Sequence, residues 1–188
     1  MSSIIGACRL ASARRHITAG KLVAYPTEAV YGLGCDPFNS DAVFRLLAAK
    51  RRPVHKGLIL IAADPEQLNP LLRPLDPDLR RRVHASWPGP VTWVLSAHPL
   101  TPWWLTGGRR TLAVRVTDHP LAAELCRACG PLVSTSANIS GSRPARTALE
   151  ARLRLGPAVD LVLPGAVGGL ERPTEMRDGS SGRILRPG

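Results

Sequence analysis

Apolar and polar residues follow two different periods along the chain, and these predict alternating helices and strands. Apolar positions recur at helical spacing over residues 5–19, and Gly20 ends the run. Asn39 or Ser40 can cap a helix that extends to Ala49, and two more helices are predicted over 120–129 and 147–155. A capping Asp followed by Pro indicates further helix starts at 64 and 76. Short apolar runs predict strands at 22–25, 58–62, 91–97, 111–116, 132–134, 161–163 and 184–185. This order is typical of an α/β fold built around one sheet.

A single domain over residues 1–188 accounts for this pattern, because the chain contains no internal repeat and no long linker. The Gly- and Pro-rich stretch 164–182 is predicted to be a surface loop. No apolar stretch approaches the length needed to span a bilayer, and the first residues lack the features of a secretory signal. We therefore expect a cytoplasmic protein with no membrane segment.

An excess of basic residues points to polyanionic partners. Lys and Arg number 25 against 14 Asp and Glu, which gives a net charge of +11. Such a chain favours nucleic acids or nucleotides. A skewed coding composition would explain the same excess, because lysine occurs only at positions 21, 50 and 56. Two of these scarce lysines fall in one short stretch, 50–56, which makes that stretch a candidate site.

Cys126 and Cys129 have the spacing of a redox pair or of half a zinc site. No second pair of cysteines and no H-x-x-x-H pattern accompanies them. They also lie late in the predicted helix 120–129, whereas a helix start is the place that lowers a thiol pKa. We therefore predict that both are packed side chains and that they hold no metal.

Four segments carry polar chemistry beside predicted strands, although the P-loop and the dinucleotide fingerprint are missing. Segment 24–34 combines hydroxyls with glycines and fits either a ligand loop or a tight surface turn. Segment 50–57 fits either a phosphate clamp or a cationic helix end. Segment 134–141 follows a strand and fits either a binding loop or a Ser-rich turn. Arg115 lies inside an apolar strand and needs an anionic partner, either a buried carboxylate or a substrate carboxylate.

In this order and spacing the four segments resemble the YrdC/Sua5 family, and in particular its short bacterial form. The matching residues cover nearly the whole chain, at 26–34, 50–53, 56–60, 87–92, 113–116, 134–138 and 185–188. The resemblance implies a YrdC-like α/β domain with a twisted, mostly mixed sheet, flanking helices and a wide basic groove. It also implies an enzyme that forms L-threonylcarbamoyladenylate and pyrophosphate from L-threonine, bicarbonate and ATP. Partner proteins then transfer the threonylcarbamoyl group to adenosine 37 of tRNAs that read codons starting with A.

The same resemblance implies roles for individual residues of such a nucleotidyltransferase. Lys50 and Arg52 are the expected catalytic pair, which holds the phosphates of ATP. The other expected ATP ligands are Lys56, Thr111, Ser136, Asn138 and Arg186. The expected threonine ligands are Thr27, Arg115 and Thr135. Mg²⁺ is expected to arrive on the phosphates of ATP, because the sequence shows no carboxylate cluster for a metal site of its own.

The chain departs from the family pattern in three places. Ala29 stands where many relatives have Thr, and residues 173–178 differ from the run found in many relatives. These differences leave the ligand contacts of both segments open. The extra C-terminal domain of the longer family form has no counterpart in this sequence.

Two other functions compete with this interpretation. A non-catalytic module that binds double-stranded RNA, tRNA or ribosomes needs only the basic charge, although the chain offers few aromatic residues for stacking on single strands. The related domain of hydrogenase-maturation carbamoyltransferases handles carbamoyl adenylate, but those proteins are much longer. The synthase hypothesis requires Lys50 and Asn138 to meet around one triphosphate.

Overall fold

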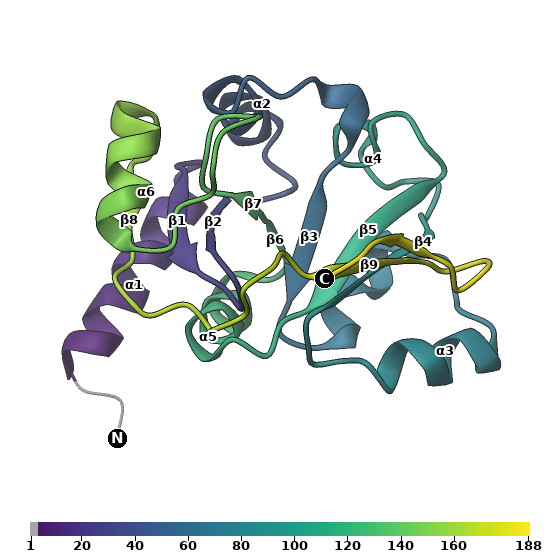
Figure 1. Ribbon diagram of the computed structural model, residues 1–188. Coiled ribbons are helices and arrows are strands. Elements are labelled where there is room, and N and C mark those ends of the chain that lie inside the picture. Colours follow the sequence, from purple (N-terminus) through teal and green to yellow (C-terminus); the bar gives the residue numbers. More distant parts are fainter. Residues whose placement is uncertain (1–3) are drawn as a thin grey trace.

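Two mixed β-sheets lie side by side in the computed structural model, which describes residues 4–188 (Figure 1). The smaller sheet has the strand order β7-β2-β1-β8, and the larger has the order β10-β9-β4-β5-β3-β6. The strands are β1 (Val23–Pro26), β2 (Tyr31–Gly34), β3 (Ile59–Ala62), β4 (Val91–Ser96), β5 (Thr111–Val116), β6 (Leu132–Val133), β7 (Thr135–Ser136), β8 (Leu161–Val162), β9 (Glu175–Asp178) and β10 (Ile184–Arg186). The predicted α/β class is confirmed. The strands form two sheets where one was expected, because their order along the chain does not reveal which edges pair.

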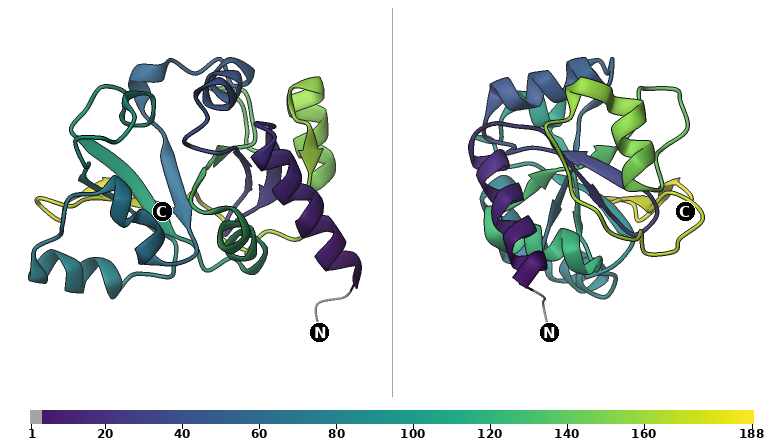
Figure 2. Two further views of the ribbon diagram at one scale, coloured as in Figure 1. Left: turned by 180° about the vertical axis from the view of Figure 1, so that it is seen from behind. Right: turned by 90° about the vertical axis from the view of Figure 1, so that its left-hand side faces the viewer.

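Helices cover the outer faces of the sheets. The α-helices are α1 (Ile4–Thr18), α2 (Ser40–Ala49), α3 (Pro77–His84), α4 (Trp103–Thr106), α5 (Pro120–Cys129) and α6 (Ala148–Leu155). Three short 3₁₀ helices are η1 (Val54–Lys56), η2 (Pro65–Leu71) and η3 (Gly156–Ala158). Helices α1 and α5 pack on each other and on β1, with α1 lying across the outside of the molecule (Figure 2). No helix in the described part of the chain has the length and apolar character needed to cross a membrane.

The helix starts follow the capping signals in the sequence. The side chain of Asn39 accepts a hydrogen bond of 3.0 Å from the backbone N–H of Ala42, and Asp76 caps α3 in the same way. Asp64 also caps a helix as predicted, but that helix is the 3₁₀ helix η2. Pro70 lies inside η2, and a proline removes the backbone donor that a regular α-helix needs there.

One apolar core extends across both sheets. Leu33 of β2, Leu60 of β3 and Val114 of β5 belong to the same cluster, and all three are fully buried. Burial of one such side chain stabilises the fold by about 1.5–3 kcal/mol. The shared core therefore fixes the position of the small sheet relative to the large one.

The predicted loop 164–182 contains a strand that the sequence did not reveal. Strand β9 pairs in parallel with β4 and antiparallel with β10. The prediction was wrong here because β9 is polar and only half buried, so it shows neither an apolar run nor an alternation. Strand β2 was also missed, since two of its four residues are glycines. One of them, Gly34, is required by packing: a Cβ there would lie 2.7 Å from the hydroxyl of Tyr25.

The part of this stretch before β9, residues 164–174, is attached to the fold by specific hydrogen bonds. The hydroxyl of Tyr31 donates to the carbonyl of Gly165 at 2.6 Å and accepts from its N–H at 3.0 Å. Farther along, the N–H of Gly168 donates to the carbonyl of Thr27 at 3.0 Å. The segment therefore passes beside the loop between β1 and β2, next to one of the candidate binding segments.

Candidate active site

A cavity of about 500 Å³ opens where the chain crosses from one sheet to the other. Strand β6 belongs to the large sheet, β7 belongs to the small sheet, and Ser134 is the only residue between them. The N–H of Ser134 donates to the carbonyl of Ile59 at 2.8 Å. The cavity is lined by Thr135 and Ser136 on the small sheet and by Ile59, Val94 and Ala113 on the large one, among others.

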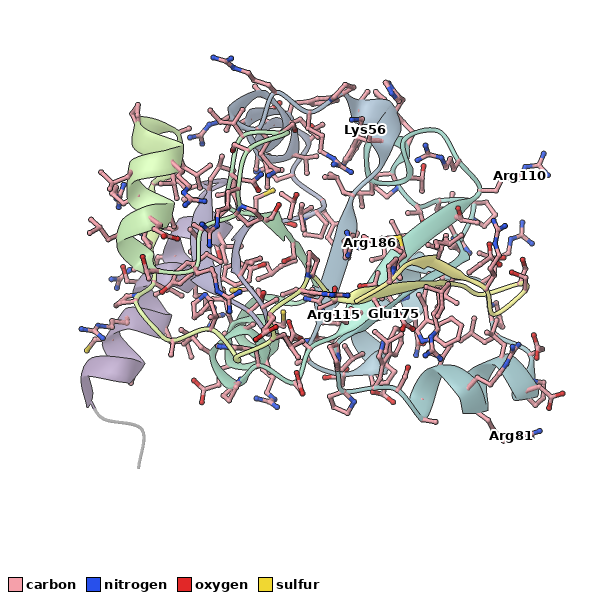
Figure 3. The ribbon with its side chains drawn as sticks, in the orientation of Figure 1. Lys56, Arg81, Arg110, Arg115, Glu175 and Arg186 are labelled. Atoms are coloured by element: carbon pink, nitrogen blue, oxygen red, sulfur yellow. The ribbon has the colours of Figure 1, made fainter. Side chains whose placement is uncertain are left out.

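The lining of this cavity is strongly cationic. It contains five basic side chains, Arg52, Lys56, Arg109, Arg115 and Arg186, and none of the described residues that line it is Asp or Glu. Figure 3 shows Arg115 and Arg186 near the middle of the molecule, whereas Arg81 and Arg110 project from its surface. Arg115 is paired with Glu28, which lies behind the lining, and the excess of positive charge that remains favours an anionic ligand of high charge.

Lys50 links the end of α2 to the segment that carries Ser136 and Asn138. Its ammonium donates to the carbonyl of Ser136 and, at 2.7 Å, to the carbonyl of Asn138. The side chain is buried, with 2% exposure, and it does not line the cavity. Burial, followed by the charge of Arg52, lowers the pKa of Lys50 to about 8. The two segments thus meet, with Lys50 bound to backbone carbonyls behind the cavity wall.

Asn138 has a similar position behind the wall. Its Nδ2 donates to the carbonyls of Ile139 and Ser142, at 2.9 and 2.7 Å. Its Oδ1 is buried and has no hydrogen-bond partner among the described residues. A buried acceptor without a partner is uncommon in folded proteins. Asn138 therefore holds the turn after β7 through its Nδ2.

Arg52 follows α2 and lines the cavity directly. The residue is half buried, and its guanidinium donates twice to the carbonyl of Gly57, from Nη2 at 2.8 Å and from Nε at 3.3 Å. Burial, followed by the nearby charge of Arg109, lowers the pKa of Arg52. Because one carbonyl takes both hydrogen bonds, the rest of the guanidinium remains available to a ligand.

Arg115 has a buried carboxylate partner and also lines the cavity. Its Nη2 forms an ion pair of 3.1 Å with Glu28, and its Nη1 donates to the hydroxyls of Thr174 and Thr92 at 3.1 and 3.3 Å. The Nε of Arg115 is buried without a partner among residues 4–188. Burial alone would raise the pKa of Glu28, but Arg115 and the hydroxyl of Thr117 lower it overall. Glu28 and the two threonine hydroxyls thus fix the guanidinium of Arg115 at the cavity wall.

Eight of the ten residues expected from the sequence line the cavity. They are Thr27, Arg52, Lys56, Thr111, Arg115, Thr135, Ser136 and Arg186, and the two exceptions are Lys50 and Asn138. Ala29 also lines it, and so do Pro173, Thr174 and Met176 from the segment that departs from the family pattern. Sequence reasoning missed Thr174 and Arg109. The signal for Arg109 was its basic charge two residues before Thr111, but a single Arg in so basic a chain carries little information.

The cysteine pair lies outside this cavity. Cys126 is fully buried, and burial raises the pKa of its thiol well above the ordinary range. Burial also raises the pKa of Cys129. Redox and metal chemistry require the thiolate, which a raised pKa disfavours. The structure accordingly shows both thiols as free, packed side chains at the end of α5.

Comparison with known proteins decides the family. Residues 15–188 match the model of the Sua5, YciO and YrdC proteins, whose description is telomere recombination. The chain belongs to the Sua5/YciO/YrdC family. This family also supplies the resemblance noted in the sequence, and a solved member has a similar fold: Sua5 of P. abyssi in complex with L-threonine superposes with a TM-score of 0.88 at 33% identity. The match covers 95% of this chain and 53% of that longer protein.

Sua5/YciO/YrdC relatives of similar length carry an enzyme name. A protein of Halorhodospira halophila named threonylcarbamoyl-AMP synthase is 58% identical over 179 residues, which are 95% of this chain and 94% of the relative. A protein of Pseudomonas putida with the same name is 48% identical over 185 residues, which are 98% of this chain and all of the relative. The family match over residues 15–188 includes every residue that lines the cavity and all strands of both sheets.

Proposed function

We propose that this chain is a threonylcarbamoyl-AMP synthase, a nucleotidyltransferase that forms L-threonylcarbamoyladenylate and pyrophosphate from L-threonine, bicarbonate and ATP. The observation that supports it best is the cavity with five basic side chains and no acidic residue in its described lining. A triphosphate has the charge that such a lining neutralises. The identity of 58% to a protein with this name supports the same reaction.

The proposed reaction has two steps. The amine of threonine combines with bicarbonate to form a carbamate and water. An oxygen of the carbamate then attacks the α-phosphorus of ATP in line, the bond to the bridging oxygen breaks, and pyrophosphate leaves. The protein forms no covalent bond in this scheme. Its task is to position the two substrates, to neutralise the charge of the leaving pyrophosphate and to exclude water from the carbamate.

Arg115 is the proposed partner of the threonine carboxylate. Its side chain lines the cavity, and Glu28 holds the guanidinium in one orientation. The side chains of Thr27 and Thr135 line the same cavity and supply hydroxyl contacts. The complex of P. abyssi Sua5 with L-threonine is consistent with an amino-acid site in this fold.

The phosphates of ATP are proposed to lie against three further cations of the lining, Arg52, Lys56 and Arg186, with Ser136 and Thr111 beside the nucleotide. Lys50 adds positive potential from behind the wall and holds the carbonyls of Ser136 and Asn138 in place. No group of His, Cys, Asp and Glu within residues 4–188 could hold a metal ion. In this proposal Mg²⁺ therefore enters with ATP as part of the substrate.

Mass spectrometry of the reaction mixture tests the function. The chain is incubated with ATP, Mg²⁺, bicarbonate and threonine, and we expect a threonylcarbamoyl-adenylate peak that disappears when bicarbonate is omitted. A mixture that yields no adenylate, together with RNA binding that weakens steeply with salt, would favour the non-catalytic RNA-binding alternative. No specific contact among the residues that the structure describes favours that alternative.

The product requires partner proteins that consume it. A mixed carbamic–phosphoric anhydride transfers its acyl group readily, so the proposal includes downstream proteins that pass the threonylcarbamoyl group to tRNA. The basic surface of the chain would also attract tRNA. Both the transfer partners and the cytoplasm as the place of the reaction are part of this proposal.

ATP binding is expected to weaken as the pH rises through about 8, because this is the pKa to which burial and the charge of Arg52 lower Lys50. A lowered pKa means that the ammonium loses its proton as the pH rises, and the positive potential behind the phosphates is then lost. Calorimetric titration with ATP on both sides of this pH, without threonine or bicarbonate, measures the effect. A Lys50→Met variant that folds should bind ATP weakly at every pH. An affinity of the natural chain that stays constant would contradict the role of the charge.

A further inference from the structure

The turn after α4 places an unassigned arginine at the rim of the cavity. Gly107 and Gly108 both have left-handed backbone angles, with φ values of 65° and 82°. A Cβ at Gly107 would lie 2.7 Å from the carbonyl oxygen of His55 and 2.8 Å from the nitrogen of Gly57, so only glycine lets the turn approach so closely. The turn therefore packs directly on the backbone at the end of η1, and Arg109 follows it.

Two guanidiniums converge at Gly57. Arg52 donates to the carbonyl of Gly57 at 2.8 Å, while Nη1 of Arg109 lies 3.2 Å from the position that a Cβ of Gly57 would occupy. The charge of Arg109 is close enough to lower the pKa of Arg52. The side chain of Arg109 makes no hydrogen bond or ion pair with any residue of the described chain, and the cavity lining around it contains no carboxylate. Two like charges held together without a counter-ion have the arrangement of a polyanion clamp.

The position of Arg109 along the cavity indicates which part of the polyanion it would contact. Arg115 is buried, Arg52 is half buried, and Arg109 is exposed, as is Lys56 beside it. If the threonine carboxylate lies at Arg115, the α-phosphate lies near that inner end, since the carbamate must reach it. The outer two phosphates then extend toward the rim.

We propose that Arg109 is an ATP-binding residue that, together with Arg52, contacts the outer two phosphates and the departing pyrophosphate. The inference rests on the proposed function and extends it to a residue outside the predicted set. It requires that Arg109 distinguishes ATP and pyrophosphate from AMP, which lacks the outer phosphates.

Isothermal titration of ATP, pyrophosphate and AMP tests this, with Arg110 as the matched control. Arg110 has the same charge and the next position in the chain, but its side chain projects outward from the molecule (Figure 3) and does not line the cavity. We expect Arg109→Ala to weaken ATP and pyrophosphate binding by about tenfold, the size expected for a lost charge-assisted hydrogen bond, and to leave AMP binding unchanged. Arg109→Lys should recover part of the loss, and Arg110→Ala should bind all three ligands as the natural chain does.

Other outcomes have distinct meanings. Equal weakening by Arg109→Ala and Arg110→Ala would overturn the inference, because it would show only the effect of net charge. Equal weakening of ATP and AMP would overturn it too, since the loss would then come from the nucleoside or from a displaced turn. A natural chain that binds none of the three ligands would instead refute the proposed function.

Discussion

Replacing Arg52 with alanine is expected to lower kcat/KM for ATP by about 10²–10³-fold, the range observed when one preorganised charge-stabilising group is removed from an active site. The fold should survive, because among the described residues the Arg52 side chain donates only to the carbonyl of Gly57. Gly57 lines the cavity, so a water molecule can donate to this carbonyl in place of the guanidinium. Steady-state formation of pyrophosphate measures the activity, and urea unfolding measures the stability.

Arg51→Ala provides the matched control for this experiment. Arg51 has the same charge and the adjacent position, but it is exposed and does not line the cavity. Its φ of 49° is left-handed, and alanine tolerates that region about as poorly as arginine does. Arg51→Ala should therefore keep the natural turnover. If Arg52→Ala also kept it, the cavity would not be the site of the phosphates.

Replacing Arg115 with methionine is expected to lower the free energy of unfolding by about 3–5 kcal/mol and to abolish turnover. The loss of stability arises because Glu28 would remain buried without its charged partner, and breaking a buried ion pair from one side costs about this much. The loss of turnover arises because the proposed carboxylate ligand of threonine is gone. Urea unfolding and product analysis by mass spectrometry measure the two effects.

A double variant separates these two roles. In Glu28→Gln combined with Arg115→Met a neutral amide replaces the buried carboxylate, and its neighbour Thr117 can still donate to the amide oxygen. Most of the lost stability should return, because an apolar side chain beside a neutral amide leaves no unpaired charge. Turnover with threonine should stay absent. Recovery of turnover along with stability would mean that Arg115 acts only as a structural partner of Glu28.

Much of the fold could be predicted because its signals are local. The caps at Asn39, Asp64 and Asp76 lie where short-range hydrogen bonds require them, and the buried strand over 58–62 is a continuous apolar run. Strands β2 and β9 could not be predicted, because they are strands through pairing with their neighbours and not through their own composition. The arrangement in two sheets could not be predicted for the same reason, since it depends on contacts between distant segments.

The candidate site shows the same division between local and distant information. The family resemblance brought together the cavity-lining residues Thr27, Arg115 and Ser136. It did not indicate that the Lys50 ammonium would turn to the carbonyls of the neighbouring loop, because an open helix end gives no sign of what packs against it. Nor did it identify Arg109, which reaches the cavity only through the approach of one glycine turn to another backbone segment.

The single residue between β6 and β7 has a mechanical consequence. Because the two sheets are joined covalently at Ser134, the width of the opening between them depends on the torsion angles of one short connection as well as on side-chain packing. The N–H of Ser134 is itself bonded to the large sheet, which restricts those torsions. The part of the cavity wall at Ser134 is therefore held in place by both sheets at once.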